Sequence, residues 1–535
     1  MTPAVRRTAL VVLVLLGALA VLACALAPTL VENAVRRNLA ELPAALAGHG
    51  LALEPPEVEA VRFSPFSREL QLRKVRLTGK LLAQDGQTSR GSFLSTGEEL
   101  SLRLTWRGLF LNTPLASLLL PAGAPGAELI PVAESLRLRE TSTTVAEQSL
   151  VLTLSAEDAT AENVAMDGAL LRAVLTDAPG APGPDALDWA YGFAAGRFAL
   201  TGLELNMEAP ATGETFTATC AEFLTRGLER RHMAEQVARS IRCPLGDGRA
   251  LTIASLGQEA VTLPDKALLQ PLLRELARPQ VTRPQLENAV KTAFSGPEPL
   301  LGKGSVTGLV LPLADMEYEA LRLERGLLTW HTAQPLNQEL AIEGFSLPMA
   351  LLEREGGLAL PGISTLSLDA TVAVRAAGSG PNAPEQHTGN LAARDLCSLD
   401  YAFTLDAQGY GSELAFLRGT YSGAALNYTD AGLLPRLAAS IMPTPEAAMM
   451  ALKVGVGRVC SAATPENAAL RQALETFIER PGSLALTARA PFNLLEALVT
   501  VGEGNAGALV SATATPGPRT LAEAMRAVRA EGRGR

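Results

Sequence analysis

The segments Glu69-Leu70-Gln71-Leu72-Arg73 and Leu100-Ser101-Leu102-Arg103-Leu104 decide the fold of this chain, because leucine alternates with polar residues in both. A β-strand points successive side chains to opposite faces, so this alternation predicts strands with one apolar and one polar face. Such strands are typical of antiparallel sheets that are wet on one side. We expect a single apolar sheet face that includes Leu70, Leu72, Leu100, Leu102, Leu104, Leu150, Leu152 and Leu154.

The sequence does not decide what covers this apolar face. Residues 51–175 hold only one short amphipathic segment, around Leu109 to Leu120, that could cover it. Either a second sheet packs against the face, as in a sandwich or barrel, or the face stays open as a groove that accepts an acyl chain. At roughly 25 cal/mol per Å², an empty leucine face on the order of several hundred Å² would cost many kcal/mol.

An apolar stretch from Ala9 to Ala27 has no charged residue and is long enough for a membrane-spanning helix. Arg6 and Arg7 precede it, so the positive-inside rule sends the rest of the chain across the membrane. A signal peptide cleaved after Ala27 and a lipoprotein anchored at Cys24 are the alternatives. All three place the bulk of the chain outside the cytoplasm. The expected anchor includes Ala9, Leu13, Leu16, Leu22 and Leu26.

A short amphipathic helix follows the apolar stretch. Val31, Val35, Leu39 and Leu42 recur at helical spacing and share one face. We expect this helix either to cap the first part of the sheet or to lie on the membrane surface.

The remaining chain predicts an α+β, β-rich fold: an N-terminal transmembrane helix followed by curved antiparallel sheet, groove-like or sandwich-like, with helical inserts. Helix formers predict inserts over 221–241 and 264–294, and Thr444 and Thr464 resemble helix N-caps because proline and glutamate follow each of them. We divide the chain into five parts: an anchor with its cytoplasmic tip (1–30), an N-terminal β region (31–180), a β-rich middle with a helical insert (181–390), a C-terminal α+β region (391–515) and a basic tail (516–535). We expect the tail to be a frayed, solvated helix; a contact with acidic lipid or a partner is the alternative.

A weak internal repeat supports the β architecture. Thr201-Gly202-Leu203 resembles Thr307-Gly308-Leu309 and Glu343-Gly344-Phe345, each within a segment of β character.

The composition and motifs of the chain exclude several functions. The chain has 46 Lys and Arg against 55 Asp and Glu, a net charge of −9, so it lacks the basic footprint that nucleic-acid binding needs. Its four histidines show no metal-binding spacing, and no nucleophile elbow, phosphate loop or dinucleotide fingerprint is present. We therefore expect no catalytic site, metal or cofactor.

Four cysteines lie beyond the anchor: Cys220, Cys243, Cys397 and Cys460. An even number is compatible with disulfides in an oxidising compartment, and neighbours would pair as Cys220–Cys243 and Cys397–Cys460. Four unpaired thiols are the alternative.

The N-terminal region resembles the AsmA-like family of bacterial envelope proteins. The similarity lies in Val61-Arg62-Phe63-Ser64-Pro65-Phe66, in the strands through Leu70-Gln71-Leu72 and Val75-Arg76-Leu77-Thr78-Gly79, and in the L-x-L-x-W strand at Leu102. The resemblance implies a single-pass inner-membrane protein with a large periplasmic β-rich domain, related to long grooves proposed to carry or shield lipid acyl chains. It offers no catalytic residues. Beyond Gly180 the sequence departs from a continuous groove.

Two classes of function remain. The favoured one is a non-enzymatic envelope protein whose apolar sheet face meets lipid acyl chains or another envelope protein, with the inner membrane as its partner. The other is an envelope enzyme with a dispersed active site. A structural or partner-binding module is the outcome if the apolar face is fully covered.

Overall fold

The computed structural model describes most of the chain beyond the apolar N-terminal stretch: residues 28–43, 51–82, 89–111, 128–147, 150–171, 188, 191–210, 213–245, 248–276, 302–313, 320–331, 337–357, 359–378, 383–407 and 416–533. The chain forms two compact units. Unit 1 comprises Met1–Ala250 and Gly257–Gly296, and unit 2 comprises Leu251–Leu256 and Pro297–Arg535. The expected anchor, 9–27, lies outside the described residues.

Nineteen strands form one long, open antiparallel sheet, and helices are inserted between them. Within each unit most strands pair with the strands before and after them in the chain, through long antiparallel ladders. The β-rich antiparallel prediction is therefore confirmed. All described strands belong to this sheet, so the described part of the chain does not form the sandwich-like alternative, which needs a second sheet.

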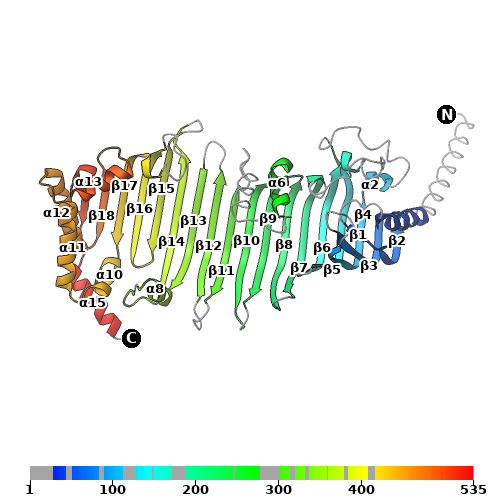
Figure 1. The fold of residues 1–535 in the computed structure, drawn as a ribbon, viewed down its shortest axis with the longest axis horizontal. Helices are drawn as coiled ribbons and strands as arrows, with labels where there is room; N and C mark the ends of the chain where they lie inside the picture. The colour runs from blue at the N-terminus through cyan, green and yellow to red at the C-terminus, as the bar shows by residue number, and fades with distance from the viewer. Residues whose placement is uncertain are drawn as a thin grey trace, which may run out of the picture. The chain divides into compact units, whose positions relative to one another are not determined.

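Unit 1 begins with the helix of residues 28–43, and its strands β3 to β9 run side by side in chain order (Figure 1). Both β1 and β2 pair with β3, at different parts of its length. The elements are β1 (Leu51–Leu53), β2 (Glu57–Ser64), β3 (Glu69–Leu82), β4 (Ser89–Leu104), α2 (Trp106–Leu111), β5 (Leu129–Glu147), β6 (Val151–Asp167), β7 (Phe193–Ala209), β8 (Glu214–Glu229), β9 (His232–Pro244), β10 (Ala250–Thr262), through which the unit boundary passes, and α6 (Lys266–Leu276).

Unit 2 continues with hairpin-connected strands and ends in a group of helices beside its last strands (Figure 1). The elements are β11 (Lys303–Pro312), β12 (Ala320–His331), β13 (Asn337–Pro348), α8 (Met349–Gly356), β14 (Thr365–Ala376), β15 (Glu385–Ala393), β16 (Cys397–Asp406), β17 (Thr420–Asp430), α10 (Leu433–Ile441), α11 (Pro445–Val459), α12 (Pro465–Glu479), β18 (Ser483–Ala488), α13 (Leu494–Gly502), α14 (Ala506–Leu509), β19 (Val510–Thr515) and α15 (Leu521–Arg533).

A line of left-handed residues crosses the unit 1 sheet and changes which residues face inward. Lys74, Glu140, Gly202 and Ser240 have φ of 48°, 48°, 59° and 53°, and they lie in β3, β5, β7 and β9. Such φ values are uncommon inside strands. In β3, Leu72 and Val75 lie on either side of Lys74 and contact the same hydrophobic cluster, although strict alternation would put them on opposite faces. Beyond this line, residues with odd numbers take the place of residues with even numbers on the apolar side of a strand such as β3. The same face of the sheet therefore stays apolar along its whole length.

The weak sequence repeat coincides with this backbone feature. Gly202, Gly308 and Gly344 lie in the middle of β7, β11 and β13 with φ of 59°, 60° and 62°. A Cβ at Gly202 would collide with the side chain of Glu157 on the neighbouring strand. Glycine suits these positions because it adopts positive φ without the Cβ penalty.

The helix predicted over 221–241 is wrong, because this stretch forms most of β8 and β9. Its helix-forming glutamates and arginines instead make cross-strand ion pairs, as between Arg226 and Glu235 at 2.7 Å. Tertiary pairing therefore overrides local propensity. Of the second predicted insert, residues 266–276 form α6, and its part beyond 276 lies outside the described residues.

The C-terminal helices confirm the predicted N-caps, but the prediction that the tail is frayed and solvated is wrong. Thr444 and Thr464 each accept a hydrogen bond from a backbone N–H of the helix that follows. The basic tail, expected to be frayed and solvated, forms α15, in which Leu521 and Met525 are fully buried. These side chains belong to a cluster with Phe477, Ile478 and Leu484, so burial against α12 and β18 fixes this helix.

Candidate functional site

One face of unit 1 carries apolar side chains in a row across five consecutive strands. The cross-strand register aligns Phe93 on β4, Val145 on β5, Leu152 on β6, Met207 on β7 and Phe216 on β8. Directly opposed side chains on one face lie close together, so these five residues form a continuous band. With strands about 4.8 Å apart, the band extends about 19 Å across the sheet.

This band and its neighbours define the β4–β8 apolar face, and none of its residues is buried. Leu150, Leu154 and Phe216 keep 37%, 43% and 42% of their surface exposed. In the next row, Leu154 lies opposite Leu205. The face comprises Phe93, Val145, Leu150, Leu152, Leu154, Leu205, Met207 and Phe216.

The opposite side of the same strands is polar. Arg137 contacts Asp158 at 2.8 Å, and Arg197 contacts Glu162 at 3.1 Å. Farther along the strands, Thr144 and Thr153 share a hydrogen bond of 3.1 Å. These cross-strand pairs are solvated and add little to stability, but they give this side a surface that suits water. Strands β4 to β8 are therefore strongly two-faced, and their exposed leucine and phenylalanine, Leu154 and Phe216, lie on the apolar side.

The N-terminal part of the predicted face is covered, in contrast to the β4–β8 part. Leu70, Leu72 and Leu104 are 7%, 6% and 4% exposed, and they form a core with Val61 and Phe63. The helix of residues 28–43 packs on this core through Val31, Val35 and Leu39, and Leu100, Leu102 and the α2 residue Leu109 contact it as well. The amphipathic helix therefore caps the first part of the sheet, which was one of the two roles expected for it.

A hydrogen bond joins this helix to the strand beneath it. The carboxylate of Glu32 accepts a bond of 3.0 Å from the backbone N–H of Phe63. Glu32 lies beside the apolar positions of the helix, so the contact fixes both position and rotation of the helix.

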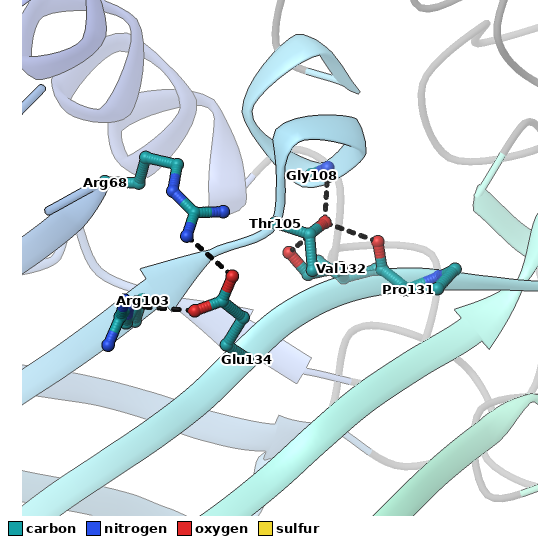
Figure 2. A network of polar contacts seen from close by, with 7 residues as sticks. All are labelled: Arg68, Arg103, Thr105, Gly108, Pro131, Val132 and Glu134. Atoms are coloured by element: carbon teal, nitrogen blue, oxygen red, sulfur yellow. Dashed lines mark hydrogen bonds and ion pairs between the residues drawn. The ribbon is translucent and has the colours of Figure 1, made fainter. Parts of the chain in front are cut away.

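A polar network beside the covered core fixes α2 and β5 (Figure 2). Glu134 binds Arg68 at 2.6 Å and Arg103 at 2.8 Å. The hydroxyl of Thr105 accepts from the N–H of Gly108 at 2.9 Å, which caps α2, and donates to a carbonyl of β5, that of Pro131 at 2.6 Å. The sequence gives no signal for the Glu134 pairs or for the bond from Thr105 to β5, because their partners are distant in the chain.

The face predicted from the sequence thus divides in two. Leu70, Leu72 and Leu104 are core residues, and Leu100 and Leu102 are half-buried against them. Leu150 and Leu154 are exposed, and Leu152 is half-buried. Five residues of the β4–β8 apolar face were not predicted: Phe93, Val145, Leu205, Met207 and Phe216. The alternation in Leu203-Glu204-Leu205-Asn206-Met207 was the signal that could have identified two of them.

Family models, curated proteins and solved structures yield no match to this chain. The site therefore stands on its geometry.

Unit 2 has an apolar face of its own. Leu340 on β13 and Leu391 on β15 are 40% and 43% exposed. On β15 and β16, His387 stacks on Phe403 with ring centroids 4.7 Å apart. Phe403 in turn contacts Tyr421 on β17 at 5.3 Å. These rings extend the apolar surface across three strands.

The four cysteines are free thiols in the structure, so neither predicted disulfide is formed. Cys220 lies opposite Ile241 rather than Cys243, and its thiol donates to the carbonyl of Glu222 at 3.2 Å. Cys397 and Cys460 pack in different hydrophobic clusters. Burial raises the pKa of both of these thiols, so they are poorly reactive near neutral pH.

Ionisable groups converge in unit 2 where β17 meets α10. Asp430 accepts hydrogen bonds from the hydroxyl of Tyr428 at 2.9 Å and from the N–H of Leu434 at 2.8 Å. Burial raises the pKa of both Asp430 and Tyr428. The carboxylate binds a backbone N–H in the first turn of α10, which is a structural role.

Metal-binding clusters and membrane-spanning helices are absent from the described ranges. Within them, no three His, Cys, Asp or Glu side chains are grouped so that they could hold a metal ion. Among the same residues, no helix is both long and apolar enough to cross a bilayer.

Proposed function

We propose that this chain is a single-pass inner-membrane protein whose periplasmic sheet binds lipid acyl chains along the β4–β8 apolar face, in a non-enzymatic envelope role. The observation that carries the proposal is the row from Phe93 to Phe216, which is apolar over five strands and exposed at its end.

The chemistry of this face suits an acyl chain. A hydrocarbon chain needs contiguous apolar area and no specific polar partner, and each of the eight side chains of the face offers such area. Exposed apolar patches of this kind on an otherwise polar protein mark sites of interaction. The capped β2–β4 core provides a closed end for the face, since Leu70 and Leu72 are already buried there.

The anchor and the compartment rest on the sequence. Arg6 and Arg7 before the apolar stretch support an inner-membrane anchor with the sheet in the periplasm. The resemblance of the N-terminal region to AsmA-like envelope proteins supports the same placement.

Photo-crosslinking tests this proposal. A benzophenone amino acid is placed at Leu154 or Phe216 in the full chain, and adducts are identified by mass spectrometry. Matched controls carry it at Thr153 or Thr215, each the adjacent residue, which points to the opposite face. We expect phospholipid adducts at Leu154 and Phe216 and not at the threonines.

Two outcomes would contradict lipid binding. Equal adduct yields at both faces would mean that the label reports detergent or bulk lipid. Protein adducts at Leu154 without lipid adducts would assign the face to a partner protein instead.

A further inference from the structure

Helix α11 buries one of its sides and leaves the other exposed. On the inner side, Ala448 and Val456 belong to the hydrophobic cluster that joins α11 to α12 and α15, the helices beside it in unit 2 (Figure 1). On the outer side, Met450 is 71% and Val454 is 48% exposed. These two residues are one helical turn apart, so they form a single exposed apolar stripe.

The exposed side of α11 lines a groove of about 680 Å³. Residues of α11 supply most of its lining, and Arg471 of α12 and Ala522 of α15 complete it. Gly457 of α11 also lines the groove, and a Cβ at this position would meet no atom of another described part of the chain within 4 Å. Another backbone can therefore approach α11 closely at Gly457.

Glu446 and Lys453 place opposite charges on the exposed side of α11. They share one stripe with Met450 and Gly457, because these positions follow the i, i+4, i+7 and i+11 spacing of a helix face. Glu446 is exposed and makes no ion pair with the described part of the chain. Lys453 contacts Glu479 of α12 at 2.5 Å, and its ammonium group has three N–H donors, so it can bind a second carboxylate.

This order of charges makes α11 complementary to its own reverse. In a two-fold symmetric pair of antiparallel helices centred on Met450, position 446 of one helix lies opposite position 454 of the other, beside Lys453. Glu446 of each copy then reaches Lys453 of the other copy, and the symmetry forms this ion pair twice. A parallel pair would instead place Glu446 against Glu446 and Lys453 against Lys453.

The position of Gly457 fits the same antiparallel pair. With Met450 at the centre, position 457 of one helix lies opposite position 443 of the other, where the chain enters α11. The missing side chain of Gly457 makes room for this entering segment of the second copy. The charges and the open space thus select the same partner in the same orientation.

We propose that α11 is the interface of a homodimer, in which the α11 helices of two copies pack antiparallel across a two-fold axis at Met450. Met450 and Val454 of each copy enter the groove of the other. The interface is small, so the dimer is weak, with a dissociation constant in the micromolar range. This inference concerns unit 2 and does not use the lipid-binding proposal.

Disulfide crosslinking of the full chain in membranes tests the register. The two-fold axis brings position 450 of one copy against position 450 of the other, so Met450→Cys should give a covalent dimer after mild oxidation with copper phenanthroline. Leu498→Cys is the matched control, because Leu498 on α13 is 61% exposed but lies outside the groove. The unaltered chain measures the background from the native cysteines. We expect a dimer yield about tenfold higher from Met450→Cys than from Leu498→Cys.

Charge reversal tests whether the partner is a second copy. Glu446→Lys places cations against each other at both symmetric contacts, so the dissociation constant of the full chain in detergent micelles should rise about tenfold in sedimentation equilibrium. Adding Lys453→Glu to this variant reverses both charges and should restore most of the affinity. An effect on the fold of the single chain would act in the other direction, because the second substitution also breaks the Lys453–Glu479 pair.

Two glycines of α11 provide a matched pair of further variants. A Cβ at Gly455 or at Gly457 would meet no atom of another described part of the chain within 4 Å, so glutamine at either position should leave the fold intact. Only Gly457 lines the groove. We expect Gly457→Gln to weaken the dimer about tenfold or more and Gly455→Gln to leave its dissociation constant unchanged.

Several results would overturn the inference. These are a full chain that stays monomeric at concentrations far above the micromolar range, equal crosslinking of Met450→Cys and Leu498→Cys, and a double charge variant that associates more weakly than Glu446→Lys alone. A different protein crosslinked to Met450→Cys, without any covalent dimer, would also overturn it and assign the groove to another partner. None of these results bears on lipid binding, which is tested at Leu154 and Phe216.

Discussion

Truncating Leu72 and truncating Leu154 to alanine should have very different effects, although both leucines belong to the face predicted from the sequence. Leu72 is 6% exposed and packs in the core that the helix of residues 28–43 covers. Removing a buried leucine side chain typically costs about 2 to 5 kcal/mol, because transfer free energy is lost and a cavity remains. Leu154 is already 43% exposed, so its truncation loses only part of that transfer term, about 1 kcal/mol, and leaves no cavity.

Hydrogen exchange of the full chain, followed by mass spectrometry of its peptides, measures both effects locally. Leu72→Ala should speed exchange of β2 and β3 amides about 30-fold or more, whereas Leu154→Ala should change β6 amides about fivefold at most. Val35→Ala, on the covering helix, should act on the same amides as Leu72→Ala.

Two results would refute this reasoning. Similar losses of protection in the two leucine variants would mean that the face is uniformly covered or uniformly open. No effect of Val35→Ala on β3 would mean that residues 28–43 do not cap the sheet.

Three other predictions concern unit 2. Asn467, 1% exposed, accepts a 2.7 Å bond from the N–H of Gly507, so Asn467→Ala should destabilise the C-terminal helices by about 2 to 4 kcal/mol in hydrogen exchange. Burial raises the pKa of Asp430 above its ordinary value of 3.8, so the ionised carboxylate destabilises the folded chain at pH values above the raised pKa. This penalty fades as the pH falls toward 3.8, so the gain in melting temperature from Asp430→Asn should shrink over this window. Cys460, whose thiol pKa is raised by burial, should alkylate slowly in the native protein at neutral pH and rapidly after denaturation without reductant, whereas failure to label after denaturation would indicate a disulfide.

Local signals were sufficient wherever the deciding partners are close in sequence. Thr444 and Thr464 cap helices as predicted because an N-cap bonds an amide three residues away. The alternation around Leu70 and Leu102 predicted strands because side-chain direction follows from backbone geometry. The helix prediction over 221–241 was wrong because the charged residues of this stretch suit the polar face of a helix or of a strand equally well.

The sequence by itself determined the two-faced antiparallel sheet, the amphipathic helix that contains Val31 and Val35, and the apolar character of both Leu72 and Leu154. The tertiary structure decided that this helix caps the sheet. Only the tertiary structure decided that Leu72 is core and Leu154 is exposed, because burial depends on what lies across the sheet and not on the period of the strand. It also decided that the tail helix is not frayed, because Leu521 and the other core residues of its cluster hold it in place. Periodicity is a property of a few neighbouring residues, whereas coverage of a face depends on segments far apart in the chain.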